Sequence, residues 1–241
     1  MSSTRKAESV YYPGTHDGLP TAVSDKPPQL VYSKQVLDWV SIQMAITSAF
    51  CFVTYNNRDS VINYLQNNPG SVWFPIILSF ITLFCMYKTE SDSTRKILFY
   101  LFTLSMSAMV SVSVLQYSPD VVFKAVVTTA LMVFAINRYS KWAAERGKRF
   151  DKLAEVGASM LFALIIVSIL QIFIRSSVLG FLICIFGVGI FTILLMTDLN
   201  MIYQKDEDFQ EDPMLAAIGI YLDIINLFLY LFEFYKKLSD D

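Results

Sequence analysis

Two aspartates lie within stretches of sequence that are otherwise strongly apolar. Asp198 falls in the run 178–203, and Asp223 lies near the middle of the run 214–234. An ionised aspartate at the centre of a bilayer costs roughly 3 kcal/mol on insertion scales, so such a residue faces protein or water and is a candidate functional group. Two neighbouring carboxylates repel when both are charged, and we expect the pair to share one proton near neutral pH. That chemistry suits a proton switch, a transient cation site or a catalytic dyad.

A stripe of polar residues accompanies the second aspartate. Gly219, Asp223, Asn226 and Tyr230 follow one another at spacings of four, three and four, which puts them on one face of a helix. Asn200 adds an amide on the preceding apolar run. We expect this supporting stripe to line an internal path. A structural alternative stays open, in which each aspartate only hydrogen-bonds to backbone or to Asn226 and ties helices together.

Seven apolar runs must position these residues. The chain has 241 residues, is 54% hydrophobic and 17% charged, and has a mean hydropathy of +0.47, which is typical of a multi-pass membrane protein. We therefore expect an all-α fold with a seven-helix transmembrane domain over residues 35–237. Residues 1–34, rich in proline and polar side chains, are expected to form a disordered cytosolic tail, and 238–241 a short C-terminal tail. The spans are predicted at Trp39–Tyr55, Val72–Tyr87, Ile97–Tyr117, Val121–Ile136, Leu153–Ile174, Val178–Tyr203 and Met214–Phe234.

The distribution of basic residues predicts the orientation of the bundle. Six Lys and Arg residues lie in the predicted loop 137–152, and few lie on the opposite side of the predicted topology. Because cytosolic loops carry the excess of Lys and Arg, the N-terminus is expected in the cytosol. Lys236 and Lys237 run against this bias at the last span, so a re-entrant final segment stays open.

The inventory of reactive side chains argues against several classes of site. His16 is the single histidine, and the three cysteines, Cys51, Cys85 and Cys184, all lie in apolar runs. We therefore expect free thiols, and neither a zinc site nor a histidine-dependent catalytic site.

An aspartyl intramembrane protease would also use two membrane aspartates, but it needs a Gly-x-Gly-Asp run. Here Gly187 and Gly189 are followed by Ile190. We expect no enzymatic activity, no cofactor and no nucleic-acid partner.

Four stretches carry a resemblance to a known membrane family. They read IYLDIINLFL at 220–229, GVGIF and TDLNMI within 187–202, LFTLS at 101–105 and RFDKL at 149–153. The first resembles the signature of the Bax inhibitor family, which includes the lifeguard and Golgi anti-apoptotic proteins. The others resemble its sixth helix, its third helix and the entry to its fifth. The resemblance extends over roughly residues 32–236.

The resemblance implies six helices wrapped around a central seventh. It also implies a pH-sensitive calcium leak from the endoplasmic reticulum or Golgi that restrains programmed cell death, with Asp198 and Asp223 as a proton-sharing gate that contacts Ca²⁺ transiently. Calcium is then a permeant ion rather than a cofactor, and the partners are the lipid bilayer and other membrane proteins of cell-death signalling. Two departures matter: the family pattern Asp-Thr-Gln is Asp198-Leu199-Asn200 here, and Met106 stands where many members have Glu.

The pH dependence of such a leak follows from the acid pair. Loss of the shared proton leaves two like charges, so we expect the leak to fall below neutral pH and to rise above it. The acid missing at Met106 is expected to lower the flux without changing this sign. The alternative is a non-conducting interaction protein that modulates cell-death or stress signalling, and calcium flux into liposomes that contain only this protein separates the two.

Overall fold

The computed structural model describes residues 28–115, 117–204 and 212–239. Most of the predicted tail, up to residue 27, lies outside the described residues, whereas residues 28–34 belong to the first helix rather than to a tail. Every regular element in the described part is a helix. In chain order these are α1 (Pro28–Asn56), α2 (Arg58–Asn67), the 3₁₀ turn η1 (Pro69–Val72), α3 (Trp73–Lys88), α4 (Asp92–Leu115), α5 (Pro119–Glu145), α6 (Asp151–Ile174), α7 (Ser177–Tyr203) and α8 (Pro213–Ser239).

Seven of these helices are long and apolar enough to cross a membrane, which confirms the predicted number of spans. The short α2 is an additional helix that the hydropathy of the chain does not indicate, and none of its side chains is buried. The last helix, α8, is continuous over 27 residues. At 1.5 Å per residue it is roughly 40 Å long, enough to span a bilayer, which contradicts the re-entrant alternative.

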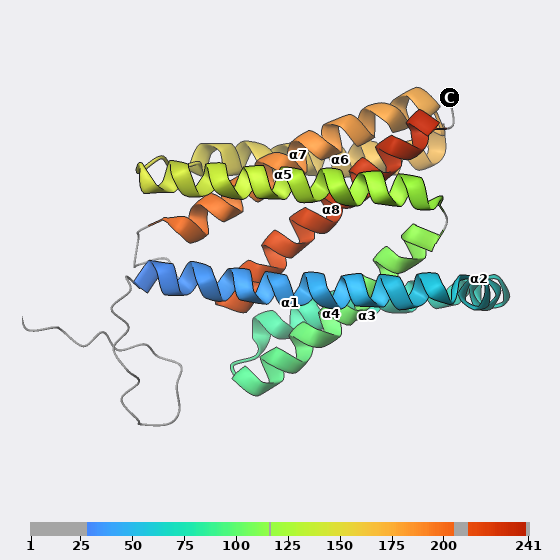
Figure 1. The fold of residues 1–241 in the computed structure, drawn as a ribbon, viewed down its shortest axis with the longest axis horizontal. Helices are drawn as coiled ribbons and strands as arrows, with labels where there is room; N and C mark the ends of the chain where they lie inside the picture. Colours follow the sequence, from blue (N-terminus) through green and yellow to red (C-terminus); the bar gives the residue numbers. More distant parts are fainter. Residues whose placement is uncertain (1–27, 116, 205–211, 240–241) are drawn as a thin grey trace, which may run out of the picture.

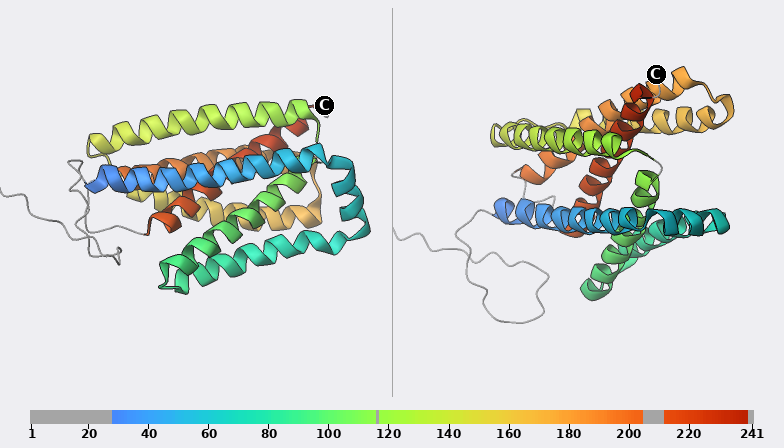
Figure 2. Two further views of the ribbon diagram at one scale, coloured as in Figure 1. Left: turned by 60° about the horizontal axis from the view of Figure 1, so that its bottom comes forward. Right: turned by 45° about the vertical axis from the view of Figure 1, so that its right-hand side comes forward.

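The helices form two groups with α8 running obliquely between them. Figures 1 and 2 show α5, α6 and α7 on one side, α1, α3 and α4 on the other, and α8 crossing from one to the other. In agreement with this view, α8 packs against α7, α5 and α1 and touches α4. The sequence explains why α8 can occupy this position, because its only acid between Pro213 and Tyr230 is Asp223 and the other faces carry Leu, Ile and Phe.

α8 is the most buried of the seven spans, with 61% of its apolar window inside the protein against 44% for α4. The main contacts of α3 are with α4, and those of α6 are with α7. These two helices therefore lie at the periphery, and a complete ring of six helices around α8 is not confirmed.

Two helices extend well beyond their predicted apolar spans. α1 begins at Pro28 instead of near Trp39, and α5 continues to Glu145, nine residues past Ile136. Tertiary packing holds the last turns of α5 in place, because Ala143 and Ala144 are buried and Ser140 Oγ donates to the Met196 carbonyl oxygen of α7 at 2.9 Å. The basic segment predicted as a loop over 137–152 is therefore largely the end of α5.

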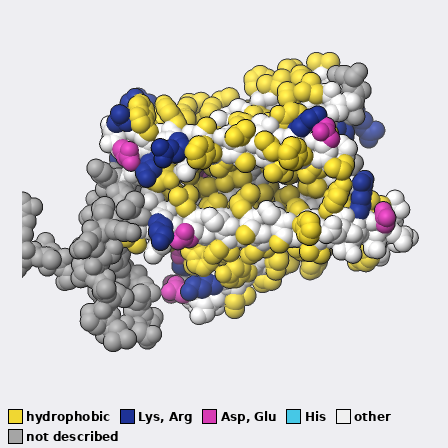
Figure 3. Space-filling model, viewed as in Figure 1, with side chains coloured by type: hydrophobic (Ala, Val, Ile, Leu, Met, Phe, Trp, Pro, Cys, Tyr) yellow, Lys and Arg dark blue, Asp and Glu magenta, His cyan; other side chains and the backbone are white. Residues whose placement is uncertain are grey.

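The exterior of the bundle suits a lipid environment. Figure 3 shows apolar side chains along the length of the molecule and Lys, Arg, Asp and Glu side chains gathered towards its two ends. Large apolar side chains such as Phe80, Phe134 and Phe173 are mostly exposed on the outer helices. Contiguous apolar surface of this extent needs lipid or another apolar partner, in contrast to the surface of a soluble monomer.

Candidate functional site

The buried acid of α8 is the centre of the candidate site. The Asp223 side chain is only 7% exposed, and its Oδ2 atom has no hydrogen-bond partner among the described residues. Burying a charged oxygen without a partner is costly, so the position calls for a proton or a cation. Asp223 also lies within Coulombic range of Asp198 on α7, which brings the two predicted acids together.

Asp198 lies level with Gly219, one helical turn from Asp223. A Cβ atom added to Gly219 would lie 3.2 Å from Asp198 Oδ2, so the absence of a side chain lets the carboxylate approach the backbone of α8. One turn corresponds to about 6 Å, so the two acids are offset by about that distance along α8. Asp198 is half-buried, which makes it the more accessible member of the pair.

The other residues of the predicted stripe also face α7 but do not bond to the acids. Asn226 Nδ2 donates to the Leu222 carbonyl oxygen of its own helix at 2.8 Å. The Tyr230 ring stacks on Phe191 with ring centroids 5.6 Å apart. It also occupies the space beside Gly187, where a Cβ atom would lie 2.5 Å from the ring. The amide nitrogen of Asn226 is thus not the group that ties Asp223 to the protein.

Asn200 is directed away from the two aspartates. It is fully buried, and its Nδ2 atom donates to the carbonyl oxygens of Ser140 at 3.3 Å and Lys148 at 3.2 Å. Gln204 Nε2 in turn donates to Asn200 Oδ1. Positions two residues apart on a helix are separated by about 200°, so Asn200 fastens the end of α7 to α5 while Asp198 faces α8.

A buried polar network on the opposite face of α8 was not predicted. The Tyr221 side chain is fully buried, and its hydroxyl lies 2.9 Å from Thr47 Oγ1 of α1, which lies 3.0 Å from Ser107 Oγ of α4. Gln43 Nε2 donates to Thr103 Oγ1 at 3.2 Å in the same region. The four-residue spacings from Gln43 to Thr47 and from Thr103 to Ser107 are a sequence signal that could have indicated this face.

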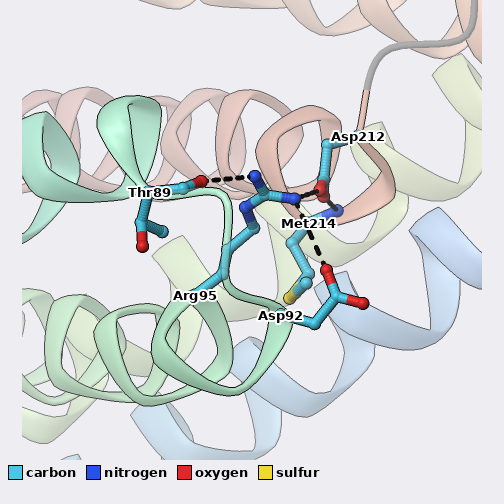
Figure 4. Close-up of polar contacts among 5 residues, drawn as sticks. All are labelled: Thr89, Asp92, Arg95, Asp212 and Met214. Carbon is cyan, nitrogen blue, oxygen red and sulfur yellow. Dashed lines mark hydrogen bonds and ion pairs between the residues drawn. The ribbon is translucent and has the colours of Figure 1, made fainter. Parts of the chain in front are cut away.

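A second cluster that the sequence reading missed joins the beginnings of α4 and α8. Figure 4 shows the Arg95 guanidinium between the carboxylates of Asp92 and Asp212 and the Thr89 carbonyl oxygen. Asp212 Oδ1 also accepts a hydrogen bond from Met214 N at 2.8 Å, which caps the first turn of α8. This charged contact fixes the end of α8 that lies nearest to Asp198.

The arrangement can exchange protons and make brief contacts with a cation, but it does not form a closed metal cage. No group of three His, Cys, Asp or Glu that could hold a metal ion occurs among the described residues. Met106, which replaces an acid of the family pattern, is half-buried and packs against the apolar core. Together these observations define the class: a helical membrane protein with an acid pair between its last two spans.

The comparison with known proteins assigns the family. A family model described as "Inhibitor of apoptosis-promoting Bax1" matches residues 30–240, so the chain belongs to the Bax inhibitor family. It is 27% identical to the BI1-like protein of Arabidopsis thaliana, over 87% of this chain and 85% of that protein. It is 26% identical to LIFEGUARD 4 of the same plant, over 92% and 91% of the two chains. It is also 26% identical to the Golgi anti-apoptotic protein of vaccinia virus (strain Lister), over 85% and 84%.

Proposed function

We propose that this protein restrains programmed cell death from an internal membrane and that it acts as a pH-sensitive calcium leak. The description of the family, "Inhibitor of apoptosis-promoting Bax1", and the relative named Golgi anti-apoptotic protein support the first part. One observation of the chain itself supports the second. Asp223 lies in α8, the most buried of the seven spans, and its buried Oδ2 atom has no hydrogen-bond partner among the described residues. Asp198 of α7 lies beside Gly219, one turn of α8 away. An acid at this depth is typical of an ion or proton pathway.

The two carboxylates give the leak its pH dependence. When the pair holds one proton, the repulsion between α7 and α8 is relieved and the helices pack closely. When the proton is lost, two negative charges separate the helices or attract a divalent cation, and both outcomes favour conduction. The leak is therefore expected to decrease as the pH falls below neutral and to increase above it.

Purified protein in calcium-loaded liposomes tests this function. The wild type should release calcium several-fold faster at about pH 8 than at about pH 6. Asp198→Asn and Asp223→Asn each leave a single acid, so both variants should show a much flatter pH profile. The same pH profile in all three proteins would refute the acid-pair gate. Calcium release indistinguishable from that of empty liposomes in all three would favour a non-conducting interaction protein.

The proposed location is the endoplasmic reticulum or the Golgi, with the N-terminus in the cytosol. The relative named a Golgi anti-apoptotic protein supports an internal membrane. The basic residues at the end of α5, among them Arg138 and Lys141, support the orientation, because this end of the bundle is also the beginning of α1. Other membrane proteins of cell-death signalling are its proposed partners.

A further inference from the structure

A cavity of about 350 Å³ lies between α6, α7 and α8. It is lined by Ser168 and Gln171 of α6, by Gly180 of α7 and by Asn226, Glu233 and Lys237 of α8, with apolar side chains between them. Glu233 and Lys237 of this lining lie in the last turns of α8. That end of α8 is far from the beginning of the helix, where the Arg95 cluster lies (Figures 1 and 2).

The cavity continues the polar stripe of α8 that contains the buried acid. Asp223, Asn226, Tyr230, Glu233 and Lys237 follow one another at spacings of three, four, three and four, so they share one helix face. The last four of these line the cavity. The lining thus runs for about 16 Å along α8, from near its C-terminal end to within one turn of Asp223.

The wall of the cavity is mostly apolar, but it carries polar groups that can bind water. Gln171 Oε1 is buried and has no hydrogen-bond partner among the described residues, while its Nε2 atom donates to the Ser176 carbonyl oxygen at 2.7 Å. An open pocket of this size with unsatisfied acceptors in its wall offers hydrogen-bond partners to ordered water. The cavity is therefore suited to hydrated ions.

Glu233 is the acid at the outer part of this cavity. Its Oε1 atom lies 3.7 Å from Lys237 Nζ, and its Oε2 atom accepts a hydrogen bond from the Tyr117 hydroxyl at 3.3 Å. Burial and the neighbouring Glu233 charge raise the pKa of Tyr117, so this phenol stays a neutral donor. Lys236 is also close, since its Nζ atom lies 3.5 Å from the same hydroxyl.

The pairing of Lys237 with Glu233 is easily broken. The two side chains are 26% and 38% exposed, and partly exposed pairs of this kind contribute little stability. The Lys237 stem crosses Gly180, where a Cβ atom would lie 3.1 Å from Nζ. The absence of a side chain at Gly180 thus leaves room for the ammonium group beside α7.

We propose that this cavity is a water-filled vestibule through which cations reach Asp223, with Glu233 as their first binding group and the Lys237 ammonium as a tethered competitor for it. The proposal rests on the proposed leak function. It adds to that function an entrance on the far side of the membrane from the Arg95 cluster, and it gives Lys237 an inhibitory role.

Water access can be measured without any calcium flux. In a protein that carries Cys51→Ala, Cys85→Ser and Cys184→Ala, Ser168→Cys places a thiol in the cavity. Ile169→Cys is the matched control, because Ile169 is the next residue of α6 and is 52% exposed on the apolar exterior. A cationic methanethiosulfonate reagent should modify Ser168→Cys at least tenfold faster than Ile169→Cys. Equal rates would overturn the vestibule.

The role of the charged pair is tested by calcium release from proteoliposomes. Lys237→Met should raise the flux several-fold and Glu233→Gln should lower it, and the double variant should behave like Glu233→Gln. Lys124→Met is the control, because it removes the same charge at the same end of the bundle from a surface pair with Asp120. A flux in Lys237→Met no higher than in Lys124→Met would refute the competitor role.

The two experiments separate the vestibule from the leak itself. Rapid modification of Ser168→Cys without calcium release in any variant would refute the leak and support the water-filled cavity. Slow modification with normal, pH-dependent release would refute the vestibule and leave the leak intact.

Discussion

At the residue scale, α8 carries two buried polar side chains that differ in their hydrogen bonding. The Tyr221 hydroxyl is hydrogen-bonded to Thr47, whereas Asp223 Oδ2 has no hydrogen-bond partner in the part of the chain that the structure describes. We expect Asp223→Leu to insert and fold with undiminished stability, because a group that is costly to bury is replaced by an apolar one of similar volume. Tyr221→Phe should lose about 1 kcal/mol, since one buried hydrogen bond is removed and the Thr47 hydroxyl is left with fewer partners.

Thermal unfolding of the two variants in detergent, beside the wild type, checks this contrast. If Asp223→Leu is degraded in cells while Asp223→Asn is stable, the aspartate mainly hydrogen-bonds between helices and the structural alternative is correct.

The acid pair was predictable from the sequence because intramembrane acids are rare, and their depth follows from counting residues along a helix. Asn200 was assigned to the supporting polar stripe, but it contacts Ser140 of α5. The rotation of α7 about its axis decides which of its faces meets α8. The Arg95–Asp212 contact could not be predicted, since the two residues are 117 positions apart. Each lies just before an apolar span, where a charged residue is equally well explained by exposure to solvent.

At the scale of elements, the packing of α7 on α8 depends on a residue without a side chain. The Tyr230 ring fills the space beside Gly187, where the nearest ring atoms would lie 2.5–2.7 Å from an added Cβ. Gly187→Ala should therefore force the ring or the helices apart and destabilise the protein by about 1–3 kcal/mol. Gly189→Ala is the matched control two residues away, because no atom of the described residues lies within 4 Å of its added Cβ.

Unfolding midpoints in detergent measure the difference between these two alanine variants. A truncated partner, Tyr230→Ala, should remove most of the penalty of Gly187→Ala, because the clashing ring is absent. Equal midpoints for Gly187→Ala and Gly189→Ala would show that α7 and α8 do not need this close approach.

The existence of the seven long helices followed from hydropathy, whereas α2 and the ends of the helices did not. The turns of α5 beyond Ile136 contain Arg138 and Lys141, so a hydropathy window excludes these turns. Ala143 and Ala144 of the same turns are nevertheless buried against the rest of the protein. Tertiary packing of small side chains thus extends a helix whose local sequence is polar. Tertiary packing also explains why hydropathy missed the beginning of α1, where the buried Ser33 and Val36 precede the apolar span.

At the scale of the whole molecule, the orientation in the membrane decides which compartment each end of the helix bundle meets. Glu145 is exposed at the basic end of α5, and Gln66 is exposed on α2 at the opposite end of the bundle. In a cysteine-free protein expressed in cells, we expect an impermeant maleimide to label Glu145→Cys once the plasma membrane alone is permeabilised. Replacing Glu145 or Gln66 by cysteine removes no basic residue, so the charge bias that sets the topology is kept. Gln66→Cys should be labelled only after detergent opens the internal membrane, and the reverse order would place the basic end in the lumen and contradict the proposed orientation.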